Sequence, residues 1–303
     1  MQNSLQEKIS EEVRAQILLE ALPYIQKFHN KIIVIKYGGA AMIESNLRES
    51  FAKDIVLLKY VGLHPVIIHG GGPKINALLD RLNIKTQFIE GQRYTSEETM
   101  EIVEMVLSGS INKEIVGLIQ KHGGKAIGLS GKDANLAIAK PLQILKTENG
   151  TTKKLELGLV GSIESINPKI LFDMIQNGYV PVIAPVSPDS NGRSLNINAD
   201  IMAAAIASAL QSEKLILLTD TKGVLKEGQL INRLTPIQVR NLIKEKIIQG
   251  GMLPKVESCL KALEQGVQKA HIIDGRIPHS ILIELFSNKG IGTMISPEEE
   301  SET

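Results

Sequence analysis

The 303-residue chain has a single cysteine and no tryptophan, and aromatic residues make up only 3% of it. One cysteine excludes an intrachain disulfide and a metal site built from thiolates alone, and Cys259 lies in an amphipathic run typical of an inert packed thiol. So few aromatic side chains argue against a surface on which nucleic-acid bases stack. The formal net charge of +1 gives no basic patch for nucleic acid or an anionic membrane.

Long hydrophobic runs are also missing. The longest are of strand length, as in residues 31–37, whereas a bilayer-spanning helix needs about 20 apolar residues. The first 30 residues contain four glutamates among their apolar positions, which fits neither a secretory signal nor an acid-poor transit peptide. With 43% hydrophobic and 22% charged residues, the composition predicts a soluble, globular, cytoplasmic protein.

The N-terminal segment carries an apolar stripe from Ile9 to Phe28 at three- and four-residue spacing, which predicts a helix. Ser10 suits the N-cap, and Pro23 should kink this helix or split it in two. The stripe packs either on its own domain or, as an arm, on another subunit.

Apolar runs rich in Ile and Val alternate with amphipathic stretches along the rest of the chain. Such runs are typical of strands buried on both faces of a parallel sheet, and the alternation predicts an α/β fold with helices on both faces. Residues 136–162 instead predict antiparallel hairpins around a polar turn at 147–153. Strands are expected at 31–37, 65–69, 125–129, 179–186, 214–220 and 270–274, and helices at 47–61, 73–82, 95–122 (with a Thr95–Glu98 capping box), 168–178, 200–211, 255–266 and from 236 onward.

Glycine-rich turns follow the first two strands, at residues 36–39 (Lys-Tyr-Gly-Gly) and 69–72 (His-Gly-Gly-Gly). In an open α/β sheet, ligands bind beyond the carboxyl ends of the strands, and glycines there let backbone N–H groups approach an anion. Either turn alone could reflect tight backbone packing, but two neighbouring turns favour an anion site. Neither a G-x-G-x-x-G fingerprint, a P-loop nor a G-x-S-x-G elbow is present.

Four further side chains are candidates, each with a simpler alternative. Arg93 could hold a carboxylate bidentately or lie in solvent. Asp200 could act in a site or merely cap the helix that follows. Lys255 stands near the positive end of a helix, a position that an anionic ligand would favour, although a solvated lysine is the alternative. His69 is interpreted as structural rather than as a base, and the six histidines show no metal-ligand spacing.

Six segments occur in a characteristic order within residues 31–295: IVIKYGGAAM, VIIHGGGPKIN, GQRYTS, LNINAD, LLTDTKGVL and GGMLPKV. Together they resemble the amino acid kinase superfamily, and within it the N-acetylglutamate kinases. The resemblance implies a three-layer αβα sandwich around a mainly parallel sheet. It implies an oligomerisation helix (1–29), a half that binds the acyl amino acid (30–186) and a half that binds ATP (187–303).

The implied reaction is phosphoryl transfer from ATP, which carries Mg²⁺, to the side-chain carboxylate of N-acetyl-L-glutamate, the second step of arginine biosynthesis. That carboxylate is already ionised at neutral pH, so no general base is needed, and the main task is to neutralise charge. By the resemblance, Lys36 and Lys255 stabilise the transferring phosphoryl group and Asp200 orients them. The same match assigns Gly71, Gly72, Arg93 and Asn196 to the acyl-glutamate, and Gly38, Gly39, Thr219, Asp220 and Lys222 to the nucleotide, with no metal ligand from the protein.

A kinked N-terminal helix and a C-terminal segment, HIIDGRIPHSILIELF followed by GIGTM, resemble those of arginine-inhibited members. This implies a hexamer built as a trimer of dimers and feedback inhibition by arginine. The arginine site would be lined by Tyr24, Lys222, His271, Glu284 and Gly290, with Glu284 suited to a guanidinium. The resemblance leaves open whether a PII signalling protein binds.

Two other functions compete with this interpretation. One is another carboxylate kinase of the superfamily, such as a glutamate 5-kinase or an aspartokinase; the setting of Arg93 and the lack of an appended regulatory domain argue against it. The other is a non-catalytic regulatory protein on the same fold, and the intact set of Lys36, Asp200 and Lys255 argues against that.

Overall fold

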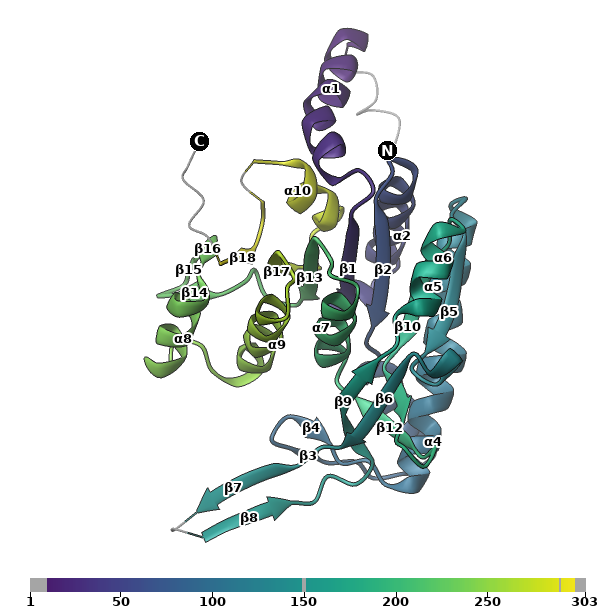
Figure 1. Cartoon of the computed structure of the whole chain (residues 1–303), viewed down its shortest axis with the longest axis vertical. Coiled ribbons are helices and arrows are strands. Elements are labelled where there is room, and N and C mark those ends of the chain that lie inside the picture. Colours follow the sequence, from purple (N-terminus) through teal and green to yellow (C-terminus); the bar gives the residue numbers. More distant parts are fainter. Residues whose placement is uncertain (1–9, 149–150, 289, 298–303) are drawn as a thin grey trace.

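The fold is known from a computed structural model that describes residues 10–148, 151–288 and 290–297. Its centre is an eight-stranded sheet in the order β16-β18-β17-β13-β1-β2-β10-β5 (Figure 1). Every neighbouring pair is parallel except β17 with β18, so the predicted mainly parallel sheet is confirmed. The strands are β1 (Ile32–Tyr37), β2 (His64–His69), β5 (Ala126–Ser130), β10 (Val180–Ala184), β13 (Lys214–Thr219), β16 (Arg233–Leu234), β17 (Lys269–Asp274) and β18 (Thr293–Ile295).

The strand expected at 179–186 proves to be two strands. It breaks at Pro185, after which β11 (Val186–Pro188) joins a second sheet with the order β11-β12-β9-β6. That sheet contains β6 (Ala137–Pro141), β9 (Val160–Ile166) and β12 (Ser194–Ile197). The predicted hairpin is β7 (Ile144–Glu148) with β8 (Thr151–Leu155), and residues 149–150 of its turn lie outside the described residues. Two small hairpins were not predicted: β3 (Phe88–Ile89) with β4 (Gln92–Arg93), and β14 (Leu225–Lys226) with β15 (Gln229–Leu230).

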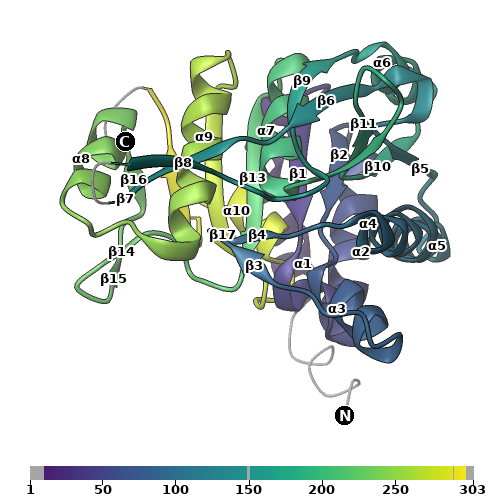
Figure 2. The same ribbon diagram turned by 90° about the horizontal axis from the view of Figure 1, so that it is seen from below.

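Helices cover both faces of the large sheet, which confirms the three-layer αβα architecture (Figure 2). α7 (Ala199–Ala209) and α9 (Leu253–Glu264) pack together on one face, while α2 (Ser45–Tyr60), α5 (Asn112–Lys121) and α10 (Ser280–Phe286) lie on the other. The core between these layers is made almost wholly of Ile, Val, Leu and Ala side chains. The remaining helices are α3 (Gly72–Arg81), α4 (Glu97–Glu104), α6 (Lys169–Gln176) and α8 (Pro236–Lys244).

Two predicted helix starts are wrong by one or two residues. The cap of α4 is Ser96, whose side chain accepts the Thr99 N–H, because the hydroxyl of Thr95 donates instead to the carbonyl of Arg93. α7 is capped by Asn198, whose side chain accepts the backbone N–H of Asp200. The carboxylate of Asp200 is therefore not needed as the cap.

A π-helical segment, Met105–Ile111, joins α4 to α5, and nothing in the apolar periodicity predicted it. A π-helix inserts extra residues per turn and often marks a functional position. Here it changes the phase of the helix immediately before Asn112, the first residue of α5.

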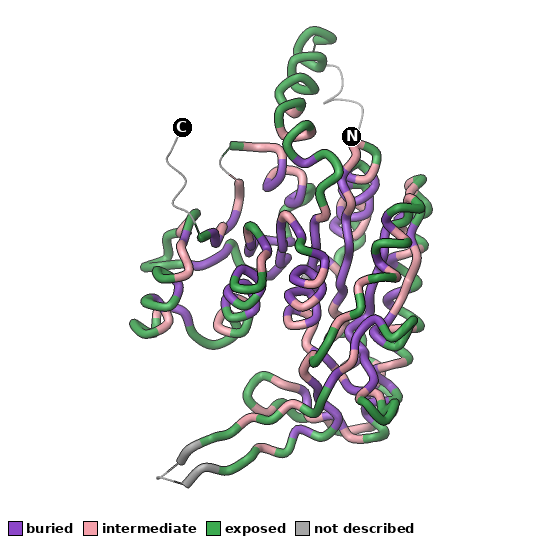
Figure 3. The backbone as a smooth tube through the Cα atoms, in the orientation of Figure 1, coloured by how far each residue is buried: buried purple, intermediate pink, exposed green. Residues whose placement is uncertain are grey.

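The arm α1 (Glu11–Phe28) leaves the body of the molecule as a projecting helix (Figure 1). Ser10 caps it as predicted, and the helix continues through Pro23 instead of splitting. Only Phe28 is buried, so the arm is exposed along most of its length in Figure 3, and within its own chain it packs against α10. The exposed apolar side chains are Val13, Ile17, Leu18, Leu19 and Leu22. Ile9 lies outside the described residues.

Candidate active site

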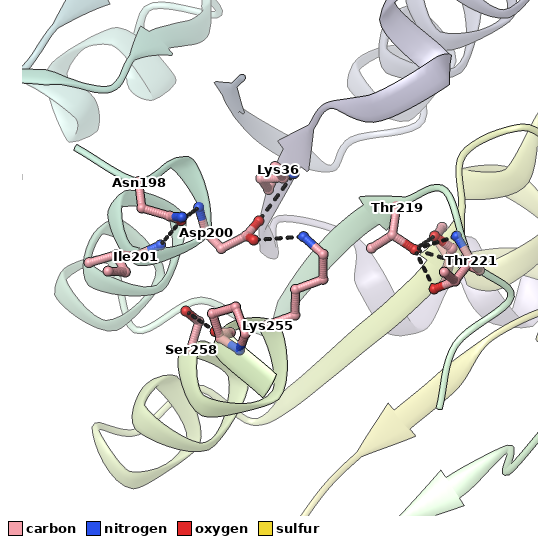
Figure 4. A network of polar contacts seen from close by, with 10 residues as sticks. Lys36, Asn198, Asp200, Ile201, Thr219, Thr221, Lys255 and Ser258 are labelled. Carbon is pink, nitrogen blue, oxygen red and sulfur yellow. Dashed lines mark hydrogen bonds and ion pairs between the residues drawn. The ribbon is translucent and has the colours of Figure 1, made fainter. Parts of the chain in front are cut away.

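Two lysines from different elements meet one buried carboxylate, as Figure 4 shows. Lys36 lies near the carboxyl end of β1, Asp200 is in the first turn of α7, and Lys255 is in the first turn of α9. Lys36 Nζ is 3.1 Å from Asp200 Oδ1, and Lys255 Nζ is 2.8 Å from Oδ2. Asn198 holds the start of α7 and so fixes where the carboxylate points. The structure thus brings the three predicted catalytic residues together.

The charges in this cluster do not balance. Burial alone would raise the pKa of Asp200, but the neighbouring charges of Lys36 and Lys255 outweigh it and hold the pKa below its ordinary value. One carboxylate therefore faces two ammonium groups, and the cluster keeps a surplus positive charge. Such a surplus, fixed in place before a ligand arrives, suits a site that must accept several negative charges.

A cavity of about 300 Å³ opens beside the cluster. Its lining includes the three charged residues, both glycine-rich turns, and apolar side chains from α2 and α5. Four of the predicted ligand-contacting glycines line it: Gly38, Gly39, Gly71 and Gly72.

The first turn has no room for side chains. A Cβ on Gly38 would lie 2.7 Å from Lys36 Nζ, and a Cβ on Gly39 would lie 2.2 Å from Asp220 Oδ1. Gly39 also has a φ of +67°, a conformation that favours glycine. Asp220 is thereby placed beside this turn. Thr219, one residue earlier, is buried and hydrogen-bonds the carbonyls of Thr221 and Ile273.

Arg93 and Asn196 form a second part of the site. Arg93 donates to Asn76 Oδ1 at 2.6 Å and to Thr86 Oγ1 at 3.0 Å. Thr95 connects the two predicted residues, since its hydroxyl donates to the Arg93 carbonyl and accepts from Asn196 Nδ2 at 3.2 Å. Neither Arg93 nor Asn196 lines the 300 Å³ cavity, so the structure pairs them with each other and not with the lysines.

Comparison with known proteins decides the family. The family model described as "Amino acid kinase family" matches residues 31–274. The chain belongs to the amino acid kinase family. Among curated proteins, the acetylglutamate kinase of Leptospira biflexa is 57% identical over 92% of this chain and 96% of its own, and that of Syntrophus aciditrophicus is 53% identical over the same shares.

A solved structure shows the same fold at lower identity. The N-acetylglutamate synthase from Neisseria gonorrhoeae, complexed with coenzyme A and N-acetyl-glutamate, matches with a TM-score of 0.79 and 24% identity. The match covers 93% of this chain and 63% of the synthase, so this amino acid kinase spans less than two thirds of that longer protein.

This amino acid kinase has a second buried cluster, near the start of β13 and β17. His271 Nδ1 lies 2.6 Å from Glu284 Oε1, and Lys214 Nζ lies 2.9 Å from His271 Nε2. A carboxylate can only accept and an ammonium can only donate, so the neutral ring carries its proton on Nδ1. Burial lowers the pKa of His271 to about 4 and that of Lys214 to about 8.

Most of the residues predicted to bind arginine gather around this cluster. Glu284 Oε2 accepts the N–H of Ile291 at 2.8 Å, and a Cβ on Gly290 would lie 2.7 Å from the same oxygen. The hydroxyl of Tyr24, from the arm, hydrogen-bonds Asn288 in the same loop. Tyr24, His271, Glu284 and Gly290 therefore lie in one region.

Lys222 does not belong to that group. It is exposed beyond the carboxyl end of β13. The hydrogen bond from Arg276 is the main reason that the pKa of Asp274 is lowered, burial opposes this shift, and the charge of Lys222 adds to it. His271 pairs with Ile216, nearer the amino end of β13. The position of Lys222 suits the nucleotide assignment and not the arginine assignment, because Lys222 and the His271–Glu284 cluster lie towards opposite ends of β13 and β17.

Sequence reasoning missed three residues: Asn198 beside Asp200, Lys214 in the second cluster, and Asn112, whose amide lies 3.3 Å from His69 Nε2 at the start of the second glycine turn. Lys214 left a signal, because a lysine that opens a completely buried strand needs partners. Asn198 lies two residues before Asp200, and both residue types are good helix N-caps, so the sequence alone did not show which of the two caps α7. Asn112 left no signal, since its place depends on the π-helical segment.

Among the described residues, metal-binding clusters and membrane-spanning helices are both absent. Over residues 10–148, 151–288 and 290–297, no group of three or more His, Cys, Asp or Glu side chains could hold a metal ion. Among the helices in the same ranges, none is long and apolar enough to cross a membrane.

Proposed function

We propose that this chain transfers the terminal phosphoryl group of ATP to the side-chain carboxylate of N-acetyl-L-glutamate, which gives N-acetyl-L-glutamyl 5-phosphate and ADP, the second step of arginine biosynthesis. The observation that carries the proposal is the Lys36–Asp200–Lys255 cluster beside the cavity. Relatives named acetylglutamate kinase, 51–57% identical over more than nine-tenths of this chain, support the choice of acceptor.

The chemistry follows from charge. An ionised carboxylate must approach a triphosphate, and the surplus positive charge of Lys36 and Lys255 offsets their repulsion most strongly where negative charge builds up in the transition state. Asp200 is held ionised between the two lysines, so it orients them and does not remove a proton. No proton has to be removed, because the acceptor is already a carboxylate with an ordinary pKa of about 4.3.

The residues present fit ATP phosphates in the first glycine turn. Gly38 and Gly39 line the cavity, and because neither carries a side chain, Lys36 and Asp220 can pack directly against this turn. Thr219, Asp220 and Lys222 follow at the carboxyl end of the neighbouring strand β13, on the nucleotide side. Mg²⁺ arrives on the phosphates of ATP, where it neutralises charge.

The acceptor side consists of Gly71, Gly72, Arg93 and Asn196. Arg93 presents a planar, always charged group that suits the α-carboxylate of the substrate. Its contacts to Asn76 and Thr86 fix the guanidinium before the substrate binds. The half 30–186 then carries most of the acceptor contacts and the half 187–303 most of the nucleotide contacts, and the halves meet in the sheet where β1 pairs with β13. Asn196 reaches the acceptor from the second half, and Gly38 and Gly39 reach the nucleotide from the first.

An acceptor panel tests the proposal. The protein is supplied with ATP, Mg²⁺ and either N-acetylglutamate, glutamate or aspartate, and ADP release is followed by a coupled assay. We expect turnover with N-acetylglutamate that exceeds the other two by about 10³-fold or more, since a site built to hold one polar group rejects analogues that lack it. Faster turnover of glutamate or aspartate would assign another carboxylate kinase, and no turnover with any acceptor would assign a non-catalytic protein.

We also propose that arginine inhibits the enzyme through the arm and the Glu284 cluster, in a hexamer formed as a trimer of dimers. The exposed apolar side chains of α1 favour a partner for the arm, since a stripe of that kind is rarely left in water. Exchange of arms across a two-fold axis would bury both stripes in a self-complementary contact. Glu284 supplies the carboxylate that a guanidinium requires, and Tyr24 connects the arm to the same loop.

A truncation tests this regulatory proposal. Deletion of residues 1–28 should leave an active, smaller oligomer whose inhibition by arginine is weakened, because arginine can act only by favouring one arrangement of subunits. Light scattering and an arginine titration of the truncated protein measure both properties. A truncated protein that remains hexameric with unchanged inhibition would show that the arm packs only on its own subunit.

A further inference from the structure

Two buried side chains, those of His69 and Asn112, lie next to the second glycine turn. His69 is the last residue of β2 and Asn112 the first of α5, and both are almost completely buried. Asn112 Nδ2 lies 2.9 Å from the carbonyl oxygen of Val182, 3.3 Å from that of Leu129 and 3.3 Å from His69 Nε2. The asparagine thus joins three neighbouring strands (β2, β10 and β5) next to the cavity.

The partners fix where the hydrogens lie. His69 Nδ1 is 2.9 Å from the carbonyl oxygen of Gly70, which can only accept, so Nδ1 carries the proton and donates. Nε2 is then the acceptor for the amide of Asn112. Burial lowers the pKa of His69 to about 4, so the ring is neutral at pH 7. The amide orientation agrees, because Asn112 Oδ1 accepts from Lys113 Nζ at 3.2 Å.

This hydrogen bond has a geometric consequence one residue further on. The carbonyl of Gly70 and the N–H of Gly71 belong to the same planar trans peptide, so they point in opposite directions. When His69 holds the carbonyl, it turns the N–H of Gly71 away from the buried histidine. Gly71 is the N-cap of α3, whose first N–H groups have no acceptor within the helix, and it lines the cavity.

Side chains of the π-helical segment also pack closely against Gly71. A Cβ on Gly71 would lie 2.5 Å from side-chain atoms of both Leu107 and Ile111, in the π-helical segment. A Cβ on Gly128 would lie only 1.7 Å from Asn112 Oδ1, so the asparagine occupies space that a glycine leaves. The packing therefore limits the orientations that the turn can adopt, and the hydrogen bond from His69 selects one of them.

We propose that His69 and Asn112 are positioning residues for the reaction: together they orient the Gly70–Gly71 peptide so that the Gly71 N–H faces the acceptor carboxylate. This inference rests on the proposed function only in taking that acceptor to be the anion bound at the turn. Neither residue touches the substrate. Each acts through the peptide, by placing one neutral donor before the anion arrives.

Two substitutions at His69 separate positioning from packing. His69→Asn retains a donor close to the position of Nδ1, whereas His69→Gln moves the donor towards the position of Nε2. We expect His69→Gln to lower kcat/KM for N-acetylglutamate by about 10- to 100-fold, as for a reacting group misplaced by about 1 Å. His69→Asn should stay within about fivefold of the wild type, and KM for ATP should change less than about twofold in both variants.

The matched controls are His64→Asn and His64→Gln, at the opposite end of the same strand, where His64 contacts Lys59. These two should give equal activities. Equal losses in His69→Asn and His69→Gln would overturn the proposal, because a packing role does not distinguish where the donor sits. If the wild type prefers another carboxylate, the same comparison is made with that acceptor, so the proposed function can fail while the inference stands.

A spectroscopic test reads the tautomer in the wild-type protein and needs a variant only to assign the signal. In protein with ¹⁵N-labelled histidine, long-range ¹H–¹⁵N correlation distinguishes the two neutral tautomers. Both buried histidines, His69 and His271, should be protonated on Nδ1 at pH 7, and the signal that is missing from the spectrum of His69→Asn identifies His69. A His69 ring protonated on Nε2 could not donate to Gly70 and would contradict the proposal whatever the activities of the two variants.

Discussion

The molecule holds two buried clusters of similar composition on the same sheet. Lys36, Asp200 and Lys255 meet at the carboxyl ends of the strands, and Lys214, His271 and Glu284 meet towards the amino ends of β13 and β17. Each combines basic nitrogens with one carboxylate. Their charges differ, because the first leaves a surplus positive charge beside a cavity, whereas the second pairs one lysine with one glutamate around a neutral histidine.

The difference shows what similar residues do in different places. The surplus positive charge at the cavity favours binding of an anionic ligand. When no anion is bound, the two ammonium groups of Lys36 and Lys255 repel each other. The balanced cluster lies between the sheet, α10 and the foot of the arm, where Lys214 Nζ is 5.1 Å from the Phe28 ring. The first cluster should therefore govern turnover, and the second should govern stability and the attachment of the arm.

The largest expected effect is on turnover. Lys36→Ala and Lys255→Ala should each lower kcat by about 10²–10³-fold with a smaller change in KM, as when one preorganised electrostatic donor is lost. Lys214→Ala, which removes a buried lysine from the other cluster, is the control and should retain kcat within about threefold. Steady-state kinetics on the three variants decide this, and wild-type kcat in either active-site variant would remove that lysine from the mechanism.

The next effect is on stability. Glu284→Gln should lower the free energy of unfolding by about 3 kcal/mol, because it leaves Lys214 and His271 without the charge that balances them. Turnover of the folded enzyme should change little. Urea unfolding followed by circular dichroism, together with kinetics on the same sample, measures both. A variant as stable as the wild type would show that the second cluster is not a balanced ion pair.

A smaller effect is expected at the acceptor side. Arg93→Lys keeps the charge but loses the planar fork and its contacts to Asn76 and Thr86. KM for N-acetylglutamate should rise by about 10- to 100-fold, the usual range for a hydrogen bond to a charged group, with little change in KM for ATP. If both KM values rose equally, Arg93 would not mark the acceptor pocket.

The smallest effect concerns acid pH. The pKa of His271 in the folded protein, about 4, lies below the ordinary value of 6.5, so the unfolded chain binds more protons between these two values. Stability should consequently fall as the pH drops from 6.5 towards 4, by at most about 1.4 kcal/mol per pH unit for this one group. His271→Asn should show a shallower fall in urea unfolding between pH 7 and pH 5. An identical slope would mean that His271 is not held neutral.

The fold was largely predictable because its signals are local. Buried parallel strands need continuous Ile and Val runs, and six such runs placed six of the eight strands in the large sheet. β16 and β18 were missed because strands of two and three residues carry no period. The cap of α1 was placed correctly, but those of α4 and α7 were placed one and two residues off. For α4, Thr95 and Ser96 are both good caps, and the contact of Thr95 with Arg93 decided between them.

The site was predictable where glycine and lysine follow a strand. Lys36 and the two glycine turns could be placed at one edge of the sheet from topology alone. The pairing of Lys255 with Asp200 followed only from the family resemblance, because it depends on how α7 packs against α9. The role of Asn112 could not be predicted for a similar reason. Its contact with His69 depends on the π-helical segment before it and on the space that Gly128 leaves for its side chain.

The most direct test of the central claim is to identify the bond that the enzyme makes. The protein is incubated with ATP, Mg²⁺ and N-acetylglutamate in the presence of hydroxylamine, which converts an acyl phosphate to a hydroxamate. We expect one hydroxamate for each ADP released, and none with Lys36→Ala above about 1% of the wild-type rate. Release of ADP without hydroxamate would mean that water is the acceptor, and would contradict an account in which two lysines bring a carboxylate to the phosphoryl group.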